Sequence, residues 1–183
     1  MAKKSITVKL YVKELVYDVQ NKTHLTGRSR FNGNNDEEVA NMKNNDDTED
    51  TYQVIRSIAT AFNYLKTKLS EYIDETSSET TMTANNLIAE YEANADTTAI
   101  EILLNHLPSN FNMAMKTSLS MSIHDYIVRR AIGEWFMITD KADAADYITQ
   151  SQNSLAEIRE AINKRVRPSR PNIPSGVGGG SAL

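Results

Sequence analysis

The chain has 183 residues, 40% of them hydrophobic, with no cysteine and a formal net charge of −4. This length supports one domain with its own core, so we expect a domain over residues 1–167 and an appended arm over residues 168–183. The absence of cysteine excludes disulfides, thiolate metal sites and cysteine nucleophiles. No apolar run approaches the roughly 20 residues of a membrane span, and no signal-peptide pattern opens the sequence, so a cytoplasmic location without membrane contact is expected.

The N-terminal segment predicts a strand followed by a short helix. Residues 5–12 alternate apolar and polar side chains, which is the pattern of a half-buried strand. From Lys13 the apolar spacing changes to that of one helix face, and Gly27 is expected to end this helix as a left-handed cap. Residues 31–45 are then expected to form a polar loop with a turn at Asn32-Gly33.

A long amphipathic helix is predicted over residues 48–74, because its apolar side chains recur every three or four positions. An acidic run lies at its start, where the positive end of the helix dipole favours carboxylates. This run contains Asp46, Asp47, Glu49 and Asp50. Part of the acidic run therefore has a local explanation.

Two apolar segments, residues 87–91 and 98–104, predict a β-hairpin, although the spacing in each also tolerates a helix. If the N-terminal strand joins this hairpin, the sheet has three strands, the minimum for independent stability against a helical layer.

Residues 111–167 predict two antiparallel helices that form the folding core. The helix break is expected near Ile138, because small oxygen-bearing side chains follow it and suit an N-cap. The single tryptophan, Trp135, precedes the turn and is expected to lock both helices. The predicted core positions are Ile123, Tyr126, Ile127, Trp135, Phe136, Ile148, Leu155 and Ile158.

Together these segments predict an α+β fold that is mostly α. We expect an antiparallel bundle of about four helices, a small antiparallel sheet or hairpin, and an extended C-terminal arm.

Charge is unevenly placed along the chain, which suggests an interface between copies. From residue 163 to the C-terminus every charged side chain is basic, and the segment is then rich in proline and glycine. Such a segment buries little apolar area alone, so we expect it to dock on another subunit, with contact inside its own domain as the alternative. The ordinary interpretation of each charged run is a solvated surface. The predicted interface residues are Arg165, Arg167, Pro168, Arg170, Ile173 and Val177 of the arm, and Asp46, Asp47, Glu49 and Asp50 of the neighbouring copy.

The sequence offers no catalytic, cofactor-binding or metal-binding candidate, so we do not expect an enzyme. The three histidines, at positions 24, 106 and 124, do not share metal-ligand spacing. His124 and Asp125 are adjacent, and neighbours on a helix do not face each other. Direct nucleic-acid binding by the basic arm is disfavoured, because no aromatic residue interleaves with its charges.

Several segments resemble the small structural proteins in virions of tailed phages that infect gut Bacteroidota, including crAss-like phages. The resemblance rests on residues 107–111 (LPSNF), 123–127 (IHDYI), 134–136 (EWF), 139–141 (TDK), 147 and 164–168 (KRVRP), with residues 16–19 and 26–30 similar in style.

The resemblance implies a homo-oligomeric ring protein at the head–tail connector or in the tail of a virion assembled in the host cytoplasm. It also implies adjacent virion proteins, such as portal, adaptor or other tail ring proteins, as partners, with DNA passing through the lumen without specific binding. In such a ring each subunit presents one surface to a different surface of the next copy. The alternative is a soluble adaptor or regulatory helical protein that binds a partner through the basic arm.

Overall fold

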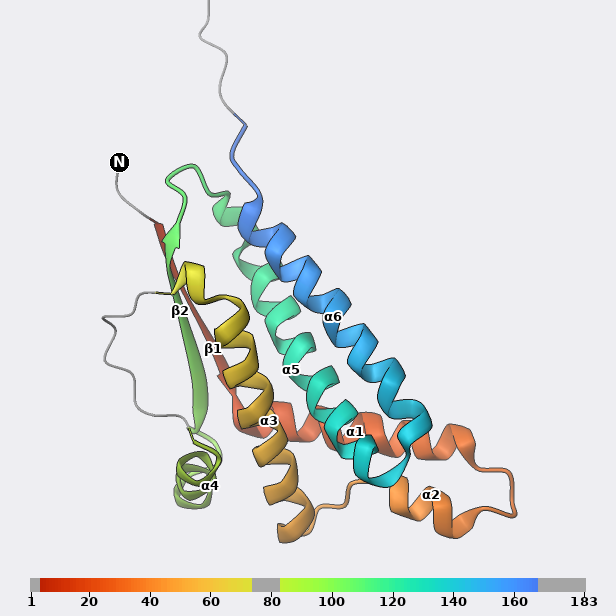
Figure 1. The fold of residues 1–183 in the computed structure, drawn as a ribbon. Coiled ribbons are helices and arrows are strands. Elements are labelled where there is room, and N and C mark those ends of the chain that lie inside the picture. Colours follow the sequence, from red (N-terminus) through yellow and green to blue (C-terminus); the bar gives the residue numbers. More distant parts are fainter. Residues whose placement is uncertain (1–3, 74–82, 168–183) are drawn as a thin grey trace, which may run out of the picture.

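The computed structural model describes residues 4–73 and 83–167, and these residues form a mostly helical α+β fold (Figure 1). Within them, six α-helices accompany a two-stranded antiparallel sheet. The elements in chain order are β1 (Lys4–Tyr11), α1 (Val12–Arg30), α2 (Asp36–Met42), α3 (Thr48–Lys68), η1 (Ser70–Tyr72), α4 (Ala84–Ala93), β2 (Ala99–Leu107), η2 (Met113–Met115), α5 (Lys116–Thr139) and α6 (Lys141–Asn163). The predicted arm, residues 168–183, lies outside the described residues.

The first strand is confirmed, and β1 pairs antiparallel with β2. Alternation puts the apolar side chains of both strands on the buried face, so that Val8 lies opposite Ile102 and Leu10 opposite Ile100. The predicted strand over residues 98–104 therefore exists as β2. The prediction of a third strand is wrong for the part of the chain that the structure describes.

Residues 87–91 belong to helix α4 rather than to a strand. The Thr83 side chain accepts a hydrogen bond from the Asn86 amide at 3.3 Å, which caps the helix start. Leu87 and Ile88 are both buried, as a helix face requires and an alternating strand does not allow. Residues 87–91 therefore form a helix, which is the alternative that their spacing also allowed.

Gly27 does not end the first helix, because α1 continues to Arg30. Instead, Gly27 is buried at a close approach to α2: a Cβ there would lie 3.3 Å from the Val39 carbonyl oxygen. The positive φ occurs at Gly33, at 86°, in the predicted Asn32-Gly33 turn. The loop prediction for residues 31–45 is wrong over the seven residues of α2.

The long third helix is confirmed, with Asp47 as its N-cap. The Asp47 side chain accepts a hydrogen bond from the Asp50 amide at 2.9 Å, so part of the acidic run has the local role expected of it. The helix ends at Lys68, earlier than predicted, and is followed by η1.

The helical hairpin of α5 and α6 is also confirmed. The break falls at Asp140, close to the predicted position, and the Asp140 side chain accepts from the Ala142 amide at 2.9 Å. The two helices approach closely at Gly133, where a Cβ would lie only 2.9 Å from Ile148 Cγ1. A glycine at this position therefore sets the spacing of the hairpin.

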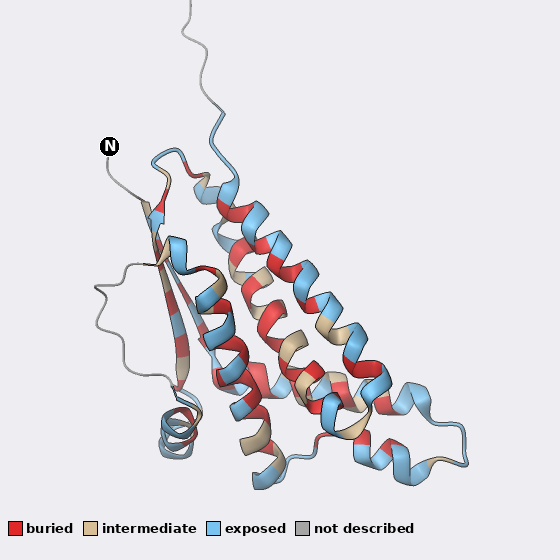
Figure 2. Cartoon of the chain, viewed as in Figure 1, coloured by how far each residue is buried: buried red, intermediate tan, exposed pale blue. Residues whose placement is uncertain are grey.

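Helix α5 lies at the centre of the fold, with α1, α3, α6 and β1 in contact with it (Figures 1 and 2). Of the eight predicted core residues, seven are buried and Ile148 is half-buried at the edge of the α5–α6 contact. The Trp135 indole N–H donates to the Met42 carbonyl oxygen at 3.0 Å, so this ring fastens α2 to α5, a contact that the sequence did not indicate.

Candidate functional site

The chain that follows α6 is fastened to the loop that precedes α5. The Val166 amide donates to the Asn110 carbonyl at 2.8 Å, and the Asn112 amide donates to the Lys164 carbonyl at 3.1 Å. Between these bonds the buried Phe111 lies opposite Arg165 in an antiparallel bridge. The backbone at the end of the described chain therefore has a fixed direction.

Two arginines of the predicted interface lie on this fastened segment. The Arg165 guanidinium donates to the Ile162 carbonyl at 2.9 Å and to Asn163 Oδ1 at 3.3 Å, and Arg167 is exposed. Among the described residues neither arginine forms an ion pair, so their positive charge is not neutralised by a carboxylate there. The other predicted arm positions, Pro168, Arg170, Ile173 and Val177, lie outside the described residues.

The acidic run divides into two pairs of carboxylates. Asp47 caps α3, and Asp50 Oδ2 accepts from the Asn45 amide at 2.8 Å, so this pair stabilises the local backbone. Asp46 and Glu49 are exposed and form no ion pair with any described residue. These two carboxylates remain available to a cationic partner.

The basic and acidic ends lie at opposite ends of the molecule. The C-terminal chain leaves beyond the end of α6, whereas α3 begins beside α2 near the α5–α6 turn (Figure 1). Helix α6 has 23 residues, which corresponds to a length of about 34 Å. Within one copy the structure does not bring Arg165 and Arg167 to Asp46 and Glu49.

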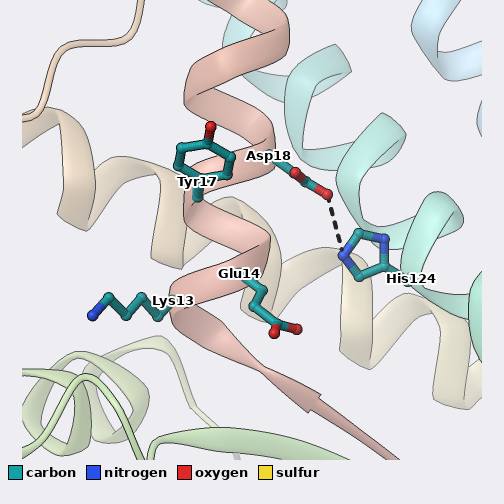
Figure 3. A pocket seen from close by; sticks show the side chains of 5 residues that line it. All are labelled: Lys13, Glu14, Tyr17, Asp18 and His124. Atoms are coloured by element: carbon teal, nitrogen blue, oxygen red, sulfur yellow. Dashed lines mark ion pairs between the residues drawn. The ribbon is translucent and has the colours of Figure 1, made fainter.

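A further surface, which the sequence reasoning missed, lies on the outer side of α1. One hollow, of about 400 Å³, opens between α1 and α5, and Figure 3 shows the five side chains that line it. Lys13 and Tyr17 point to one side of α1, whereas Glu14 and Asp18 point toward His124 of α5 (Figure 3).

A second hollow, of about 390 Å³, shares Lys13 and Tyr17 with the first and opens toward α4. Its lining includes His24 of α1, Tyr91 of α4 and Asp46 of the acidic run. Tyr17 is 64% exposed between the two hollows. We refer to Tyr17 together with the lining of both hollows as the Tyr17 surface.

The Tyr17 surface combines aromatic rings with carboxylates. Lys13 Nζ lies 2.5 Å from Asp96 Oδ1, and the hydrogen bond to Asp96 raises the pKa of Lys13, with the charge of Asp96 as the next cause. Lys13 is therefore engaged by Asp96, and Glu14 and Asp46 have no cationic partner among the described residues. Such a surface favours a cationic ligand that also presents apolar groups.

His124 faces Asp18 across the first hollow, with Nε2 3.4 Å from Asp18 Oδ2 (Figure 3). The sequence predicts that the adjacent His124 and Asp125 do not face each other. In the structure the carboxylate near His124 comes from a different helix, α1. The lining of this hollow contains no serine, threonine or cysteine for such a pair to activate. The pair joins α1 to α5 and contributes polarity to the hollow.

The sequence contains one indication of this surface, the spacing of polar and aromatic residues along α1. Lys13, Tyr17, Asn21 and His24 recur at intervals of three or four, so they form one stripe of α1. The contributions of α4 and α5 could not be foreseen, because they depend on tertiary packing.

Over residues 4–73 and 83–167 no group of three or more His, Asp or Glu side chains is placed to hold a metal ion. In the same residues no helix has the length and apolar character needed to cross a membrane. Comparison with family models, with curated proteins and with solved structures finds no match to this chain. What the fold and the surfaces define is a mostly helical α+β protein with unpaired arginines at one end, unpaired carboxylates at the other, and an aromatic, acidic face on α1.

Proposed function

We propose that this protein is a non-enzymatic structural subunit of a tailed-phage virion. It forms a homo-oligomeric ring at the head–tail connector or in the tail, and its C-terminal arm docks neighbouring subunits. The observation that carries the proposal is the distance between unneutralised arginines at one end of the molecule and unpaired carboxylates at the other. The resemblance to small virion proteins supplies the biological setting.

In the proposed ring each copy offers its basic end to the acidic end of the next copy. This contact is heterologous, and a rotation between copies closes it into a ring. Exposed ion pairs contribute only about 0–1 kcal/mol each, so Arg165 and Arg167 set the register of the contact with Asp46 and Glu49. Affinity comes from apolar burial, including the half-exposed Val166.

The rest of the assembly follows from the same proposal. Helices α3, α5 and α6 run antiparallel to their neighbours, and α1 crosses them (Figure 1). In the proposed ring these four long helices act as one rigid body, and residues 168–183 act as an extended arm. Portal, adaptor or other tail ring proteins are the neighbours above and below. DNA passes through the lumen without specific contacts, and the ring belongs to the neck or tail of a virion assembled in the host cytoplasm.

A charge-reversal experiment on the full-length chain tests the proposal. Mass photometry of the purified protein is expected to detect closed oligomers. Reversing two charges in Arg165→Glu/Arg167→Glu is expected to shift the population to smaller species. Mixing this variant with Asp46→Lys/Glu49→Lys is expected to restore assembly in part, because the charges are again opposite.

The control reverses two exposed cations away from both ends, in Lys9→Glu/Arg56→Glu on β1 and α3, and is expected to leave the oligomer unchanged. Circular dichroism verifies that each variant folds. Asp47 and Asp50 are left intact because they cap α3 and hold the preceding loop. A chain that stays monomeric with and without candidate neighbours, and that is absent from purified particles, contradicts the proposal.

The alternative of a soluble adaptor or regulatory protein predicts a different result for removal of residues 168–183. A ring subunit without its arm still folds but fails to assemble. An adaptor without its arm keeps its oligomeric state and loses binding to a single ligand.

A further inference from the structure

The sequence after Arg167 has the period of a polyproline II helix. Prolines stand at positions 168, 171 and 174, at intervals of three residues. A polyproline II helix has three residues per turn, so in that conformation the three prolines occupy one edge. Arg167, Arg170 and Ile173 recur at the same interval and occupy a second edge.

In a polyproline II conformation this segment would extend away from its own domain. The bond from the Val166 amide to the Asn110 carbonyl fixes the outgoing direction beyond the end of α6. A residue that precedes proline is disfavoured in the α region, so Arg167 and Arg170 favour continued extension over a reversal. Residues 167–174 in this conformation extend about 25 Å, which carries them away from the α1 helix of the same copy.

The Tyr17 surface has the features that bind such a segment. Grooves lined by aromatic side chains bind proline-rich segments in the polyproline II conformation. Successive prolines of one edge are about 9 Å apart, so two of them can flank one tyrosine ring. Tyr17 stands exposed between two hollows, and Tyr91 lines one of them.

The charges and the length of the Tyr17 surface also match those of residues 167–174. Glu14 and Asp46 have no cationic partner among the described residues, and charge-assisted bonds to arginine are the strongest that carboxylates form with side chains. The α1 residues that line the hollows extend from Lys13 to His24, about 16 Å along the helix axis. Pro168 to Pro174 covers about 19 Å in the polyproline II conformation.

We propose that residues 167–174 of one copy dock as a polyproline II helix on the Tyr17 surface of another copy. The prolines occupy the hollows on the two sides of Tyr17, and the arginines pair with Glu14 and Asp46. This inference rests on the proposed self-assembly and names the receptor for the arm within it. The arm then continues from the acidic end of α3 onto α1, because Asp46 belongs to both surfaces.

A crosslinking experiment between two full-length variants tests the docking directly. The chain has no cysteine, so a copy with Ile173→Cys and a copy with Asn21→Cys can form a mixed disulfide only between molecules. Asn21 is exposed and lines the second hollow. Under mild oxidation the mixed dimer is expected as a major product, identified by mass.

The matched control replaces Asn21→Cys by Gln152→Cys, an exposed position on α6, and little mixed dimer is expected. A chain carrying both Ile173→Cys and Asn21→Cys is examined at high dilution. Rapid disulfide closure within single molecules there overturns docking between copies and indicates that the arm binds its own domain.

Three variants of the Tyr17 surface test the chemistry of the contact. Tyr17→Ala is expected to reduce the association constant between copies about tenfold, because the prolines lose the ring against which they pack. Tyr17→Phe retains the ring and is expected to bind within about twofold of the parent. Glu14→Gln is expected to weaken association and to reduce its dependence on salt.

The outcomes separate this inference from the proposed function. Oligomers that persist while Ile173→Cys crosslinks equally to Gln152→Cys and to Asn21→Cys contradict the Tyr17 receptor and leave the proposed ring unaffected. Unchanged association in both Tyr17→Ala and Glu14→Gln has the same meaning. Absence of oligomers in the parent chain contradicts the proposed function itself.

Discussion

At the scale of single residues, the hydroxyl of Tyr126 is one of four buried polar side-chain atoms that lack a partner in the described part of the chain. The side chain is fully buried, and its oxygen has no hydrogen-bond partner among the described residues. A buried polar group without a partner loses its hydration and gains nothing in exchange. The ring therefore stabilises the contact between α3 and α5, whereas the hydroxyl weakens it.

Replacing this tyrosine by phenylalanine is expected to stabilise the protein. Tyr126→Phe removes the unpaired hydroxyl and keeps the ring, so the free energy of unfolding is expected to rise by about 1 kcal/mol in urea titrations. The matched control is Tyr147→Phe, because the Tyr147 hydroxyl lies 3.0 Å from Thr26 Oγ1. There the same chemical change is expected to lower stability by about 0.5–1.5 kcal/mol. A loss of stability in Tyr126→Phe is inconsistent with this account.

The same residue is expected to make stability depend on pH in the alkaline range. Burial raises the pKa of Tyr126 from 10.0 to about 12. Above pH 10 the unfolded chain releases this proton before the folded chain does, so stability is intact below pH 10 and declines as pH rises toward 12. Urea titrations at pH 9, 10 and 11 are expected to show a steeper decline in the parent than in Tyr126→Phe. Parallel curves for the two proteins contradict the assignment.

At the scale of elements, Gly133 determines how closely α5 and α6 pack. A Cβ at this position would meet Ile148 Cγ1 at 2.9 Å, and the Ile148 backbone nitrogen at 3.4 Å. Overpacking of this kind commonly costs about 1–3 kcal/mol, which exceeds the roughly 1 kcal/mol that alanine gains over glycine in helix propensity.

Gly133→Ala is therefore expected to lower the free energy of unfolding by about 1–2 kcal/mol, measured by urea titration. In an Ile148→Ala background the obstacle is gone, and the same substitution is expected to be neutral or to stabilise by up to about 1 kcal/mol. A double-mutant cycle quantifies the coupling between the two positions. Additive effects show that the side chain of Ile148 is not the obstacle.

Helix α2 depends on its contact with Trp135. Its seven residues are too few for a helix to be stable alone, and the Trp135 indole donates to the carbonyl of its last residue, Met42. Trp135→Phe is expected to lower stability by about 1–2 kcal/mol and to speed amide hydrogen exchange in Asp36–Met42. Exchange in the distant strand β1 is the internal control and should change little. Unaltered exchange in α2 indicates that other contacts hold it.

The success of sequence-based prediction also differs between elements. The long helices and β1 were predictable because many residues repeat one period. The segment over residues 87–91 is too short for its period to decide between strand and helix, and the cap at Thr83 decided it. Gly27 has the sequence signature of a helix end, and only its contact with α2 explains why the helix continues.

At the scale of the whole molecule, the described core is complete without residues 168–183. The buried cluster joins both strands, α1, α3, α4, α5 and α6, and none of its described contacts needs the arm. Deletion of these sixteen residues is therefore expected to change the free energy of unfolding by less than about 0.5 kcal/mol, as for surface changes in general. Mass photometry of the same variant is expected to show loss of the oligomer. A truncated chain that fails to fold indicates that the arm packs on its own domain.

The candidate surfaces were predictable in part. Composition alone indicated a basic C-terminal segment and an acidic run near Asp46. The distance between them, and the division of the acids into capping and unpaired groups, depends on the three-dimensional fold. The Tyr17 surface combines α1, α4 and α5, and sequence spacing cannot show which side chains from separate helices meet.

The bridge between residues 164–166 and residues 110–112 has a mechanical consequence. Tension applied to the C-terminal segment must first break the bonds to Asn110 and Asn112, and only afterwards can the last turn of α6 unwind. The force is therefore transmitted to the loop that precedes α5, the central helix. It does not first separate the C-terminal end of α6 from the domain. A force applied at Arg167 is therefore transmitted to the domain without first unwinding α6.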